Sequence, residues 1–200
     1  KVDHLVYFAV VDCTGHGVPG AFVSIVGNNG LNRAIKEFDL VDPAEILNKL
    51  TILVEDAFRQ QGYSEVRDGM DIALCCLNTQ TGELTYSGAN NPIYILSGED
   101  LREIKADKQP IGHFEDRKPF TSHTVQLQPD DTVILFSDGF ADQFGGPNGK
   151  KYKYTKMKAF LVEHSNESLQ EIGEQMKSEF ENWVEGYDQI DDVCVMGVRY

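Results

Sequence analysis

The chain has 200 residues, of which 41% are hydrophobic, and a formal net charge of −14. This length fits one domain better than two, and the hydrophobic share excludes a disordered chain. The acidic balance disfavours nucleic acid and anionic lipid as partners, because binding to phosphate groups needs a basic surface. No apolar run approaches the roughly 18 residues of a membrane span. We therefore expect this domain to make no membrane contact.

The four cysteines show neither C-x-x-C spacing nor a neighbouring pair of histidines. Each lies in an apolar, strand-like context, where a free cysteine packs as a small hydrophobe. The pattern disfavours zinc and a disulfide framework, and it favours a reducing, cytoplasmic location. Strand-like sequence follows Lys1 closely, without a signal peptide. We expect residues 1–200 to be a single domain excised from a longer sensor or regulatory protein, which could itself be bound to a membrane.

The first half of the chain begins with one strand and two helices. Residues 4–12 are β-branched and aromatic with little alternation, which predicts a buried strand. Apolar residues at helical spacing predict a helix over 21–38. A second helix begins at Asp42-Pro43-Ala44-Glu45, where an N-cap precedes proline and an acid three residues later. Its apolar stripe consists of Ile46, Leu50, Leu53 and Phe58.

From Gly69 onward the sequence period changes to that of strands. Short strands separated by turns are predicted over 71–77, 84–88, 93–96 and 101–104, followed by a loop over 105–119. Further strands are predicted over 120–127 and 132–137, then helices over 156–164 and 167–183, and a closing strand over 192–198. Because strands and helices cluster in blocks, we expect an α+β fold. Its predicted form is a four-layer αββα sandwich, with two antiparallel sheets flanked by helix pairs.

A glycine motif joins the first strand to the first helix. Gly15, Gly17 and Gly20 match G-x-G-x-x-G, the dinucleotide-binding pattern. That site needs a second strand ending in an acid about 20 residues further on, and residues 38–41 lead directly into the second helix. Asp12 would also place negative charge beside a pyrophosphate. Dinucleotide binding is therefore rejected, whereas a tight turn with Asp12 as a helix cap stays open.

Further acids stand beside predicted strands, as Asp12 does. Asp138 follows the strand over 132–137, and Asp191 and Asp192 precede the final strand. Carboxylates held at strand ends suit a hard divalent cation, since such a cation takes oxygen ligands and neutralises their repulsion. Asp142 lies one helical turn after Asp138, and the sequence does not decide between a role beside the metals and an ordinary solvated position. For Asp71, at a strand start, a solvated position is favoured over an accessory metal ligand.

Blocks of sequence resemble the PPM-type (protein phosphatase 2C-like) metal-dependent serine/threonine phosphatases, in the bacterial branch typified by the stage II sporulation protein E. The resemblance covers nearly the whole chain, with the blocks in order. They are DCTGHGVPGAF, DGMDIALCCLNTQTGELTYSGANNPIYIL, ADKQPIG, LFSDGFADQFGG and IDDVCVMGVRY.

The resemblance implies two Mn²⁺ or Mg²⁺ ions and a water that attacks the phosphoester. It implies that Asp12 bridges both metals and that the Cys13 backbone carbonyl binds one of them. Asp138 and Asp191 match further ligands, and Asp192 matches a supporting position. The implied substrate is a phosphorylated regulatory protein, such as an anti-sigma-factor antagonist. The resemblance also implies a homodimer formed through helices in residues 21–61.

The chain departs from the family pattern at two places. The family carries another metal-binding acid in a G-D-F-Y-like block before the first strand, and residues 1–200 lack this block. Eukaryotic members carry a general-acid histidine where this chain has Thr14, and that role is not transferred to His16. A catalytically weak regulatory or scaffolding domain therefore stays open as the alternative. Hydrolysis of small phosphoesters is a third reading, disfavoured because no phosphate-loop lysine is evident.

Overall fold

The structure is a computed structural model that describes residues 3–15, 17–60 and 69–200. Its contacts divide the chain into two compact units. The N-terminal unit comprises Lys1–Pro92 and Lys105–Leu127, and the C-terminal unit comprises Ile93–Ile104 and Gln128–Tyr200. That residues 1–200 form one domain stays a prediction.

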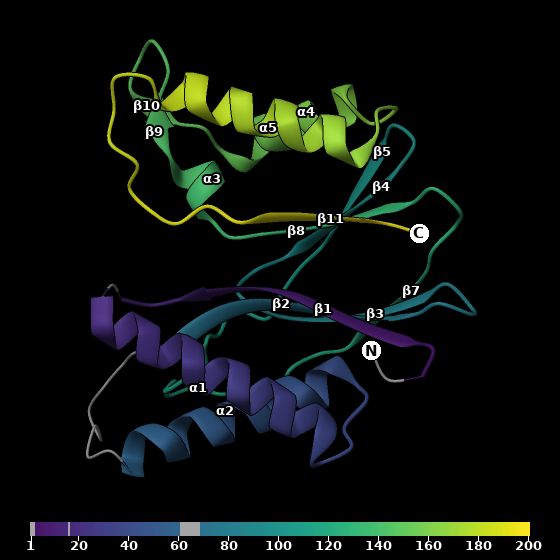
Figure 1. The fold of residues 1–200 in the computed structure, drawn as a ribbon, viewed down its shortest axis with the longest axis vertical. Coiled ribbons are helices and arrows are strands. Elements are labelled where there is room, and N and C mark those ends of the chain that lie inside the picture. Colours follow the sequence, from purple (N-terminus) through teal and green to yellow (C-terminus); the bar gives the residue numbers. More distant parts are fainter. Residues whose placement is uncertain (1–2, 16, 61–68) are drawn as a thin grey trace. The chain divides into compact units, whose positions relative to one another are not determined.

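The N-terminal unit is an antiparallel sheet covered on one face by two helices (Figure 1). The strand order is β1-β2-β3-β7, and β6 pairs with β2. The helices are α1, Gly17–Lys36, and α2, Pro43–Gln60. The strands are β1, Leu5–Cys13; β2, Gly69–Asn78; β3, Glu83–Ala89; β6, Ile111–Gly112; and β7, His123–Gln126.

Helix α2 supplies much of the core of this unit. Apolar residues at its helical spacing are buried, and they pack in one cluster with Met70 and Ile72 of β2. Burying such side chains stabilises a fold by about 1.5–3 kcal/mol each relative to exposure. The predicted start of the helix is confirmed, since the Asp42 carboxylate accepts the Ala44 and Glu45 amides at 2.9 and 3.1 Å. The large apolar side chains of α2 that are buried are those of Ile46, Leu47, Leu50, Val54 and Phe58.

The C-terminal unit is a second antiparallel sheet, of order β11-β8-β4-β5, with α4 and α5 packed on one face (Figure 1). A small hairpin of β9 and β10 follows the short helix α3. The helices are α3, Gly139–Asp142; α4, Tyr154–Glu163; and α5, Leu169–Val184. The strands are β4, Ile93–Ser97; β5, Asp100–Ile104; β8, Thr132–Phe136; β9, Phe144–Gly145; β10, Lys150–Lys151; and β11, Val195–Arg199.

The predicted class is therefore confirmed: the fold is α+β, with two antiparallel sheets and helix pairs. The stripe predicted on the last helix is also confirmed, because Ile172 and Met176 are buried in the second core. Within the described residues, no helix combines the length and the apolar character needed to cross a membrane.

The first predicted helix has different limits in the structure. It was expected over 21–38, but α1 begins at Gly17 and ends at Lys36. The early start was missed because glycines carry no apolar signal, although backbone geometry allows them in a first turn. The end follows from Asp39, whose φ of 51° is left-handed and cannot continue a helix.

Two predictions around the second half of the first sheet are wrong. The predicted loop 105–119 contains strand β6, where Ile111 pairs with Met70. The predicted strand 120–127 shortens to β7, His123–Gln126. Thr121 and Ser122 instead bind the carboxylates of Asp107 and Asp42, so side chains replace the strand pairing at these residues.

The limits of the C-terminal elements also shift. The closing strand, expected over 192–198, begins only at Val195. The hairpin of β9 and β10 was not predicted, since two-residue strands have no readable period. Helix α5 begins after a capping box in which Ser168 and Glu171 exchange hydrogen bonds, which places its start at Leu169 rather than residue 167.

Candidate functional site

Asp12 and Cys13 end strand β1 in the N-terminal unit. In the antiparallel register Asp12 is opposite Asp71, and Cys13 is opposite Met70, on β2. Directly paired residues share one face of a sheet, so the two carboxylates lie on the same face. Asp12 and Asp71 are both partly buried. The sequence favoured a solvated Asp71, because the register that pairs it with Asp12 could not be read from the chain.

The two strand ends are held together by Thr14 and oriented by Asn90. The Thr14 hydroxyl accepts the Gly69 amide at 2.8 Å and donates to the Gly69 carbonyl at 3.1 Å. Asn90 donates from its side-chain amide to an Asp71 carboxylate oxygen at 2.8 Å. Gly15 then turns the chain with a φ of 86°, a conformation that strains other residues. Thr14 therefore has a structural role here.

The thiol of Cys13 is poorly suited to bind a metal. Burial raises the pKa of the Cys13 thiol, and the negative charge of Asp12 raises it further, although a hydrogen bond with Ser24 lowers it. A thiol must lose its proton to become a strong metal ligand. This favours the backbone carbonyl over the sulfur as the group through which Cys13 could bind a cation.

Asp138 lies between β8 and α3 in the C-terminal unit, at the N-cap position of α3. Its carboxylate makes no capping hydrogen bond to any described residue of the helix. Burial raises the pKa of the Asp138 carboxyl above its usual range. The charges of Asp191 and Asp142 raise this pKa further, and the cation of Lys151 opposes them. The charges of Asp191 and Asp142 therefore act on Asp138, and the assignment of Asp138 and Asp191 as metal ligands stays a prediction.

Each neighbouring acid has a defined partner. Asp142 forms an ion pair with Lys151 at 2.7 Å. Asp191 accepts the Asp192 amide on its Oδ1 at 2.7 Å. Asp192 itself is exposed, and its carbonyl accepts the Ser137 hydroxyl at 3.1 Å. Its backbone therefore contributes to the placement of Asp191.

Gly139 allows the segment with Asp191 to approach α3. The sequence suggested that this glycine permits a sharp turn, but its φ is not among the positive values of the described residues. A Cβ at this position would instead collide with the Asp192 carbonyl and approach the Asp191 Cβ to 3.4 Å. The glycine is therefore required for a close backbone approach.

The donor chemistry of these acids fits a hard divalent cation such as Mn²⁺ or Mg²⁺. Carboxylates are its preferred ligands, and a cation would remove the repulsion that raises the Asp138 pKa. However, no three His, Cys, Asp or Glu side chains among the described residues lie together as a group that could hold a metal ion. The acids therefore do not form a complete ligand shell as they stand.

Two of the described histidines have partners away from these acids. His164 binds Glu167 at 2.9 Å, and His123 stacks on Tyr86. His16 lies outside the described residues.

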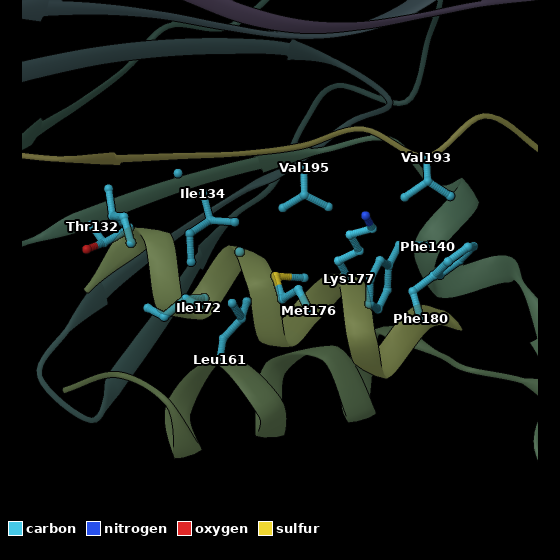
Figure 2. Close-up of a pocket in the computed structure, with 13 residues that line it drawn as sticks. Thr132, Ile134, Phe140, Leu161, Ile172, Met176, Lys177, Phe180, Val193 and Val195 are labelled. Atoms are coloured by element: carbon cyan, nitrogen blue, oxygen red, sulfur yellow. The ribbon is translucent and has the colours of Figure 1, made fainter. Parts of the chain in front are cut away.

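A cavity of about 290 Å³ lies between α5 and strands β8 and β11 (Figure 2). Met176 and Ile172 point into it from the helix, and Ile134 and Val195 point into it from the strands. An apolar lining of this kind cannot supply the oxygen ligands that a hard cation takes. The cavity is therefore a feature of the helix–sheet interface, distinct from the cluster of acids.

Comparison with known structures defines the class of the fold. The PP2C domain of SiaA from Pseudomonas aeruginosa is 27% identical with a TM-score of 0.88, over 98% of this chain and 79% of that one. The PP2C phosphatase domain of SpoIIE from Bacillus subtilis is 19% identical with a TM-score of 0.74, over 98% and 53%. RsbX, solved in complex with magnesium, is 14% identical with a TM-score of 0.66, over 98% and 82%. The fold is that of PP2C-type phosphatases.

A comparison with models of protein families identifies the family of this chain. The family model for Stage II sporulation protein E matches residues 3–200, and the chain belongs to this family. A comparison with curated proteins finds no match. The chain spans about half, 53%, of the SpoIIE structure it resembles.

Proposed function

We propose that this chain hydrolyses phosphoserine and phosphothreonine on a regulatory protein, in a reaction that depends on Mn²⁺ or Mg²⁺. The observations that carry the proposal are the close approach of Asp191 to Gly139, the residue after Asp138, and the charges of Asp191 and Asp142, which together with burial raise the Asp138 pKa. Such clusters of like charge cost stability and are typical of sites that bind a cation. Membership of the phosphatase family supports this chemistry.

The proposed metal ligands are Asp12, the Cys13 carbonyl, Asp138, Asp191 and Asp192. When bound, two divalent cations would lower the pKa of a water and neutralise charge on the phosphoryl oxygens. Three side chains hold the segments that carry these ligands. Asn90 and Thr14 hold the end of β1 beside the start of β2, and Ser137 holds the segment at Asp192.

The alternative is a catalytically weak domain with a regulatory or scaffolding role. One observation favours it, namely that the described residues contain no preformed group of metal-binding side chains. The two proposals differ in what Mn²⁺ does. An enzyme gains turnover with Mn²⁺, whereas a scaffold keeps its partner binding without it.

The substrate proposal is a phosphorylated regulatory protein of the anti-sigma-factor-antagonist kind. Family membership and structural likeness to the RsbU and RsbW domains of Rv1364c from Mycobacterium tuberculosis support it. A cytoplasmic location is proposed from the free cysteines Cys13, Cys75, Cys76 and Cys194.

A homodimer through helices in residues 21–61 also stays a prediction. The surface of α1 and α2 exposes Ile25 and Ile52, which are 60% and 49% exposed, and residue 61 lies outside the described residues. Exposed apolar side chains on adjacent helices suit a protein interface.

Hydrolysis of a phosphoserine peptide with Mn²⁺ and with a chelator tests the proposed function. We expect Mn²⁺-dependent release of phosphate, and a loss of 100-fold or more, on the order typical for catalytic electrostatics, in Asp138→Asn. Asp100→Asn, at an exposed position that begins β5, is the matched control. A rate of phosphate release that is changed neither by the chelator nor by Asp138→Asn contradicts the proposal. Phosphopeptide binding without turnover supports the scaffold instead.

A further inference from the structure

We propose that Gln143 is a positioning residue, whose buried amide holds the segment 188–192 so that Asp191 lies beside Asp138. The inference rests on the proposed function, in which these two acids are metal ligands. It adds a residue that neither the sequence motifs nor the comparisons assign.

The side-chain amide of Gln143 is fully buried, and both its nitrogen and its oxygen form hydrogen bonds. Its Nε2 donates to the Asp188 carbonyl and to the Phe144 carbonyl, both at 2.9 Å. Its Oε1 accepts the Ile190 amide at 3.2 Å. One side chain therefore binds a donor and an acceptor of the segment that precedes Asp191.

The segment needs such support because it lacks regular structure. Residues 185–194, all described, belong to neither helix nor strand. The second point of attachment is Ser137, whose hydroxyl accepts the Cys194 amide at 3.0 Å and donates to the Asp192 carbonyl at 3.1 Å. Asp191 lies between the two attachments. Its position is thus fixed from Gln143 on one side and from Ser137 on the other.

Gln143 is itself held firmly by the core of the C-terminal unit. It follows α3 directly, and its carbonyl accepts the Trp183 indole N–H at 3.1 Å and the Tyr152 amide at 3.0 Å. It is five residues from Asp138 along the same short segment. A single rigid piece of chain therefore carries one proposed ligand and the amide that places the other.

The contacts require an amide, since only an amide offers a donor and an acceptor at this reach. A glutamate would turn a carboxylate oxygen toward the Asp188 carbonyl, and a methionine would remove the hydrogen bonds to the Ile190 amide and the Asp188 carbonyl. Gln143→Met keeps the volume and removes both functions. Gln143→Asn keeps the functions and shortens their reach.

A matched control exists in the N-terminal unit. The buried Gln109 amide also bonds on both sides, donating to the Lys118 carbonyl at 2.7 Å and accepting the Lys118 amide at 3.0 Å. Gln109→Met removes an equivalent pair of hydrogen bonds from a different loop. It separates the general cost of losing a buried amide from an effect on Asp191.

The test measures amide hydrogen exchange over residues 188–192 and Mn²⁺ affinity by calorimetry in the same variants. We expect Gln143→Met to raise the exchange rate of the Ile190 amide and to weaken Mn²⁺ binding, each about tenfold or more, a loss typical of supporting residues around metal ligands. Gln143→Asn, which retains the fold most readily, should show smaller changes in the same direction. Gln109→Met should lower the thermal midpoint while leaving both quantities at the wild-type values.

Three outcomes would overturn the inference, and they are distinguishable. Unchanged exchange in both Gln143 variants would show that the amide does not hold the segment. Faster exchange with unchanged Mn²⁺ affinity would show a structural role alone, with the proposed function intact. A wild-type protein that binds no Mn²⁺ would overturn the proposed function, and with it the role of Gln143 in a metal site.

Discussion

Asp138 is the residue whose environment departs most clearly from that of an ordinary surface acid. Its carboxyl is partly buried, close to the charges of Asp191 and Asp142, and its pKa is raised for both reasons. In the metal-free protein this arrangement opposes folding at neutral pH, because the charged form is better accommodated in the unfolded chain. The repulsion is therefore a cost that a bound cation would remove.

We predict that Asp138→Asn stabilises the metal-free protein. A carboxyl with a raised folded-state pKa contributes stability that is fully present below its unfolded pKa and lost as pH rises through the folded value. The wild type should thus lose stability across that window, and the variant should not. The gain at pH 7 should be about 0.5 kcal/mol, since solvent screens a group that is partly exposed. Urea unfolding between pH 4 and 8 with a chelator measures it, and parallel pH profiles for the two proteins would contradict it.

At the scale of elements, the sequence identified helices and strands best where local chemistry sets them. The cap at Asp42 and the apolar stripes of α2 and α5 depend on neighbours in the chain, and all were predicted. Strand β6 was missed because its pairing with β2 joins residues more than forty positions apart, as Ile111 with Met70 shows. The contacts of Asp71, Gly139 and Gln143 with distant residues were missed for the same reason.

The capping box of α5 provides a prediction on one helix. Ser168→Ala should lower the free energy of unfolding by about 1 kcal/mol, because the helix loses its N-cap hydrogen bond. The Ser168 hydrogen bonds lower the pKa of Glu171. The associated stability is present above the unfolded pKa of Glu171 and is lost as pH falls through its folded value.

Chemical denaturation at pH 7 and at pH 3 measures the effect of Ser168→Ala, which should shrink at the lower pH. Ser178→Ala is the control in the same helix, since the Ser178 hydroxyl donates to the Glu174 carbonyl one turn earlier at 3.0 Å and does not cap the helix. Equal effects of the two substitutions at pH 7 would refute a capping role for Ser168.

Gly139 provides a prediction on the contact between α3 and the segment that follows α5. In Gly139→Ala the added Cβ meets the Asp192 carbonyl, so the backbone beside Asp191 must shift. We expect a loss of about 1–3 kcal/mol in stability, as for other overpacked positions, and weaker Mn²⁺ binding.

Gly173→Ala is the matched control for Gly139→Ala, because nothing lies within 4 Å of a Cβ at Gly173. This change in the interior of α5 should stabilise the protein by about 0.5–1 kcal/mol. Thermal unfolding and Mn²⁺ titration of both variants give the comparison. A Gly139→Ala protein that is as stable as the wild type would show that the close approach is not required.

At the scale of the whole molecule, the sequence predicts the fold class and the family better than it predicts the contacts of individual acids. The α+β class and the family were identified from the sequence, because motifs spread over the chain carry them, and the match over residues 3–200 confirms the family. The sequence predicts the candidate site only as a set of acids, Asp12, Asp138 and Asp191. The hydrogen bond from Asn90 to Asp71 and the ion pair of Lys151 with Asp142 depend on contacts that no local pattern encodes.

The central proposal is that Asp12 and Asp138 are metal ligands, and Mn²⁺ titration calorimetry tests it most directly. The titration compares the wild type with Asp12→Asn, Asp138→Asn and the control Asp100→Asn. The account predicts that Asp12→Asn and Asp138→Asn each weaken Mn²⁺ binding by tenfold or more, about 1.4 kcal/mol, while Asp100→Asn binds as the wild type does. Wild-type Mn²⁺ affinity in Asp12→Asn would contradict the account, because Asp12 would then not be a metal ligand.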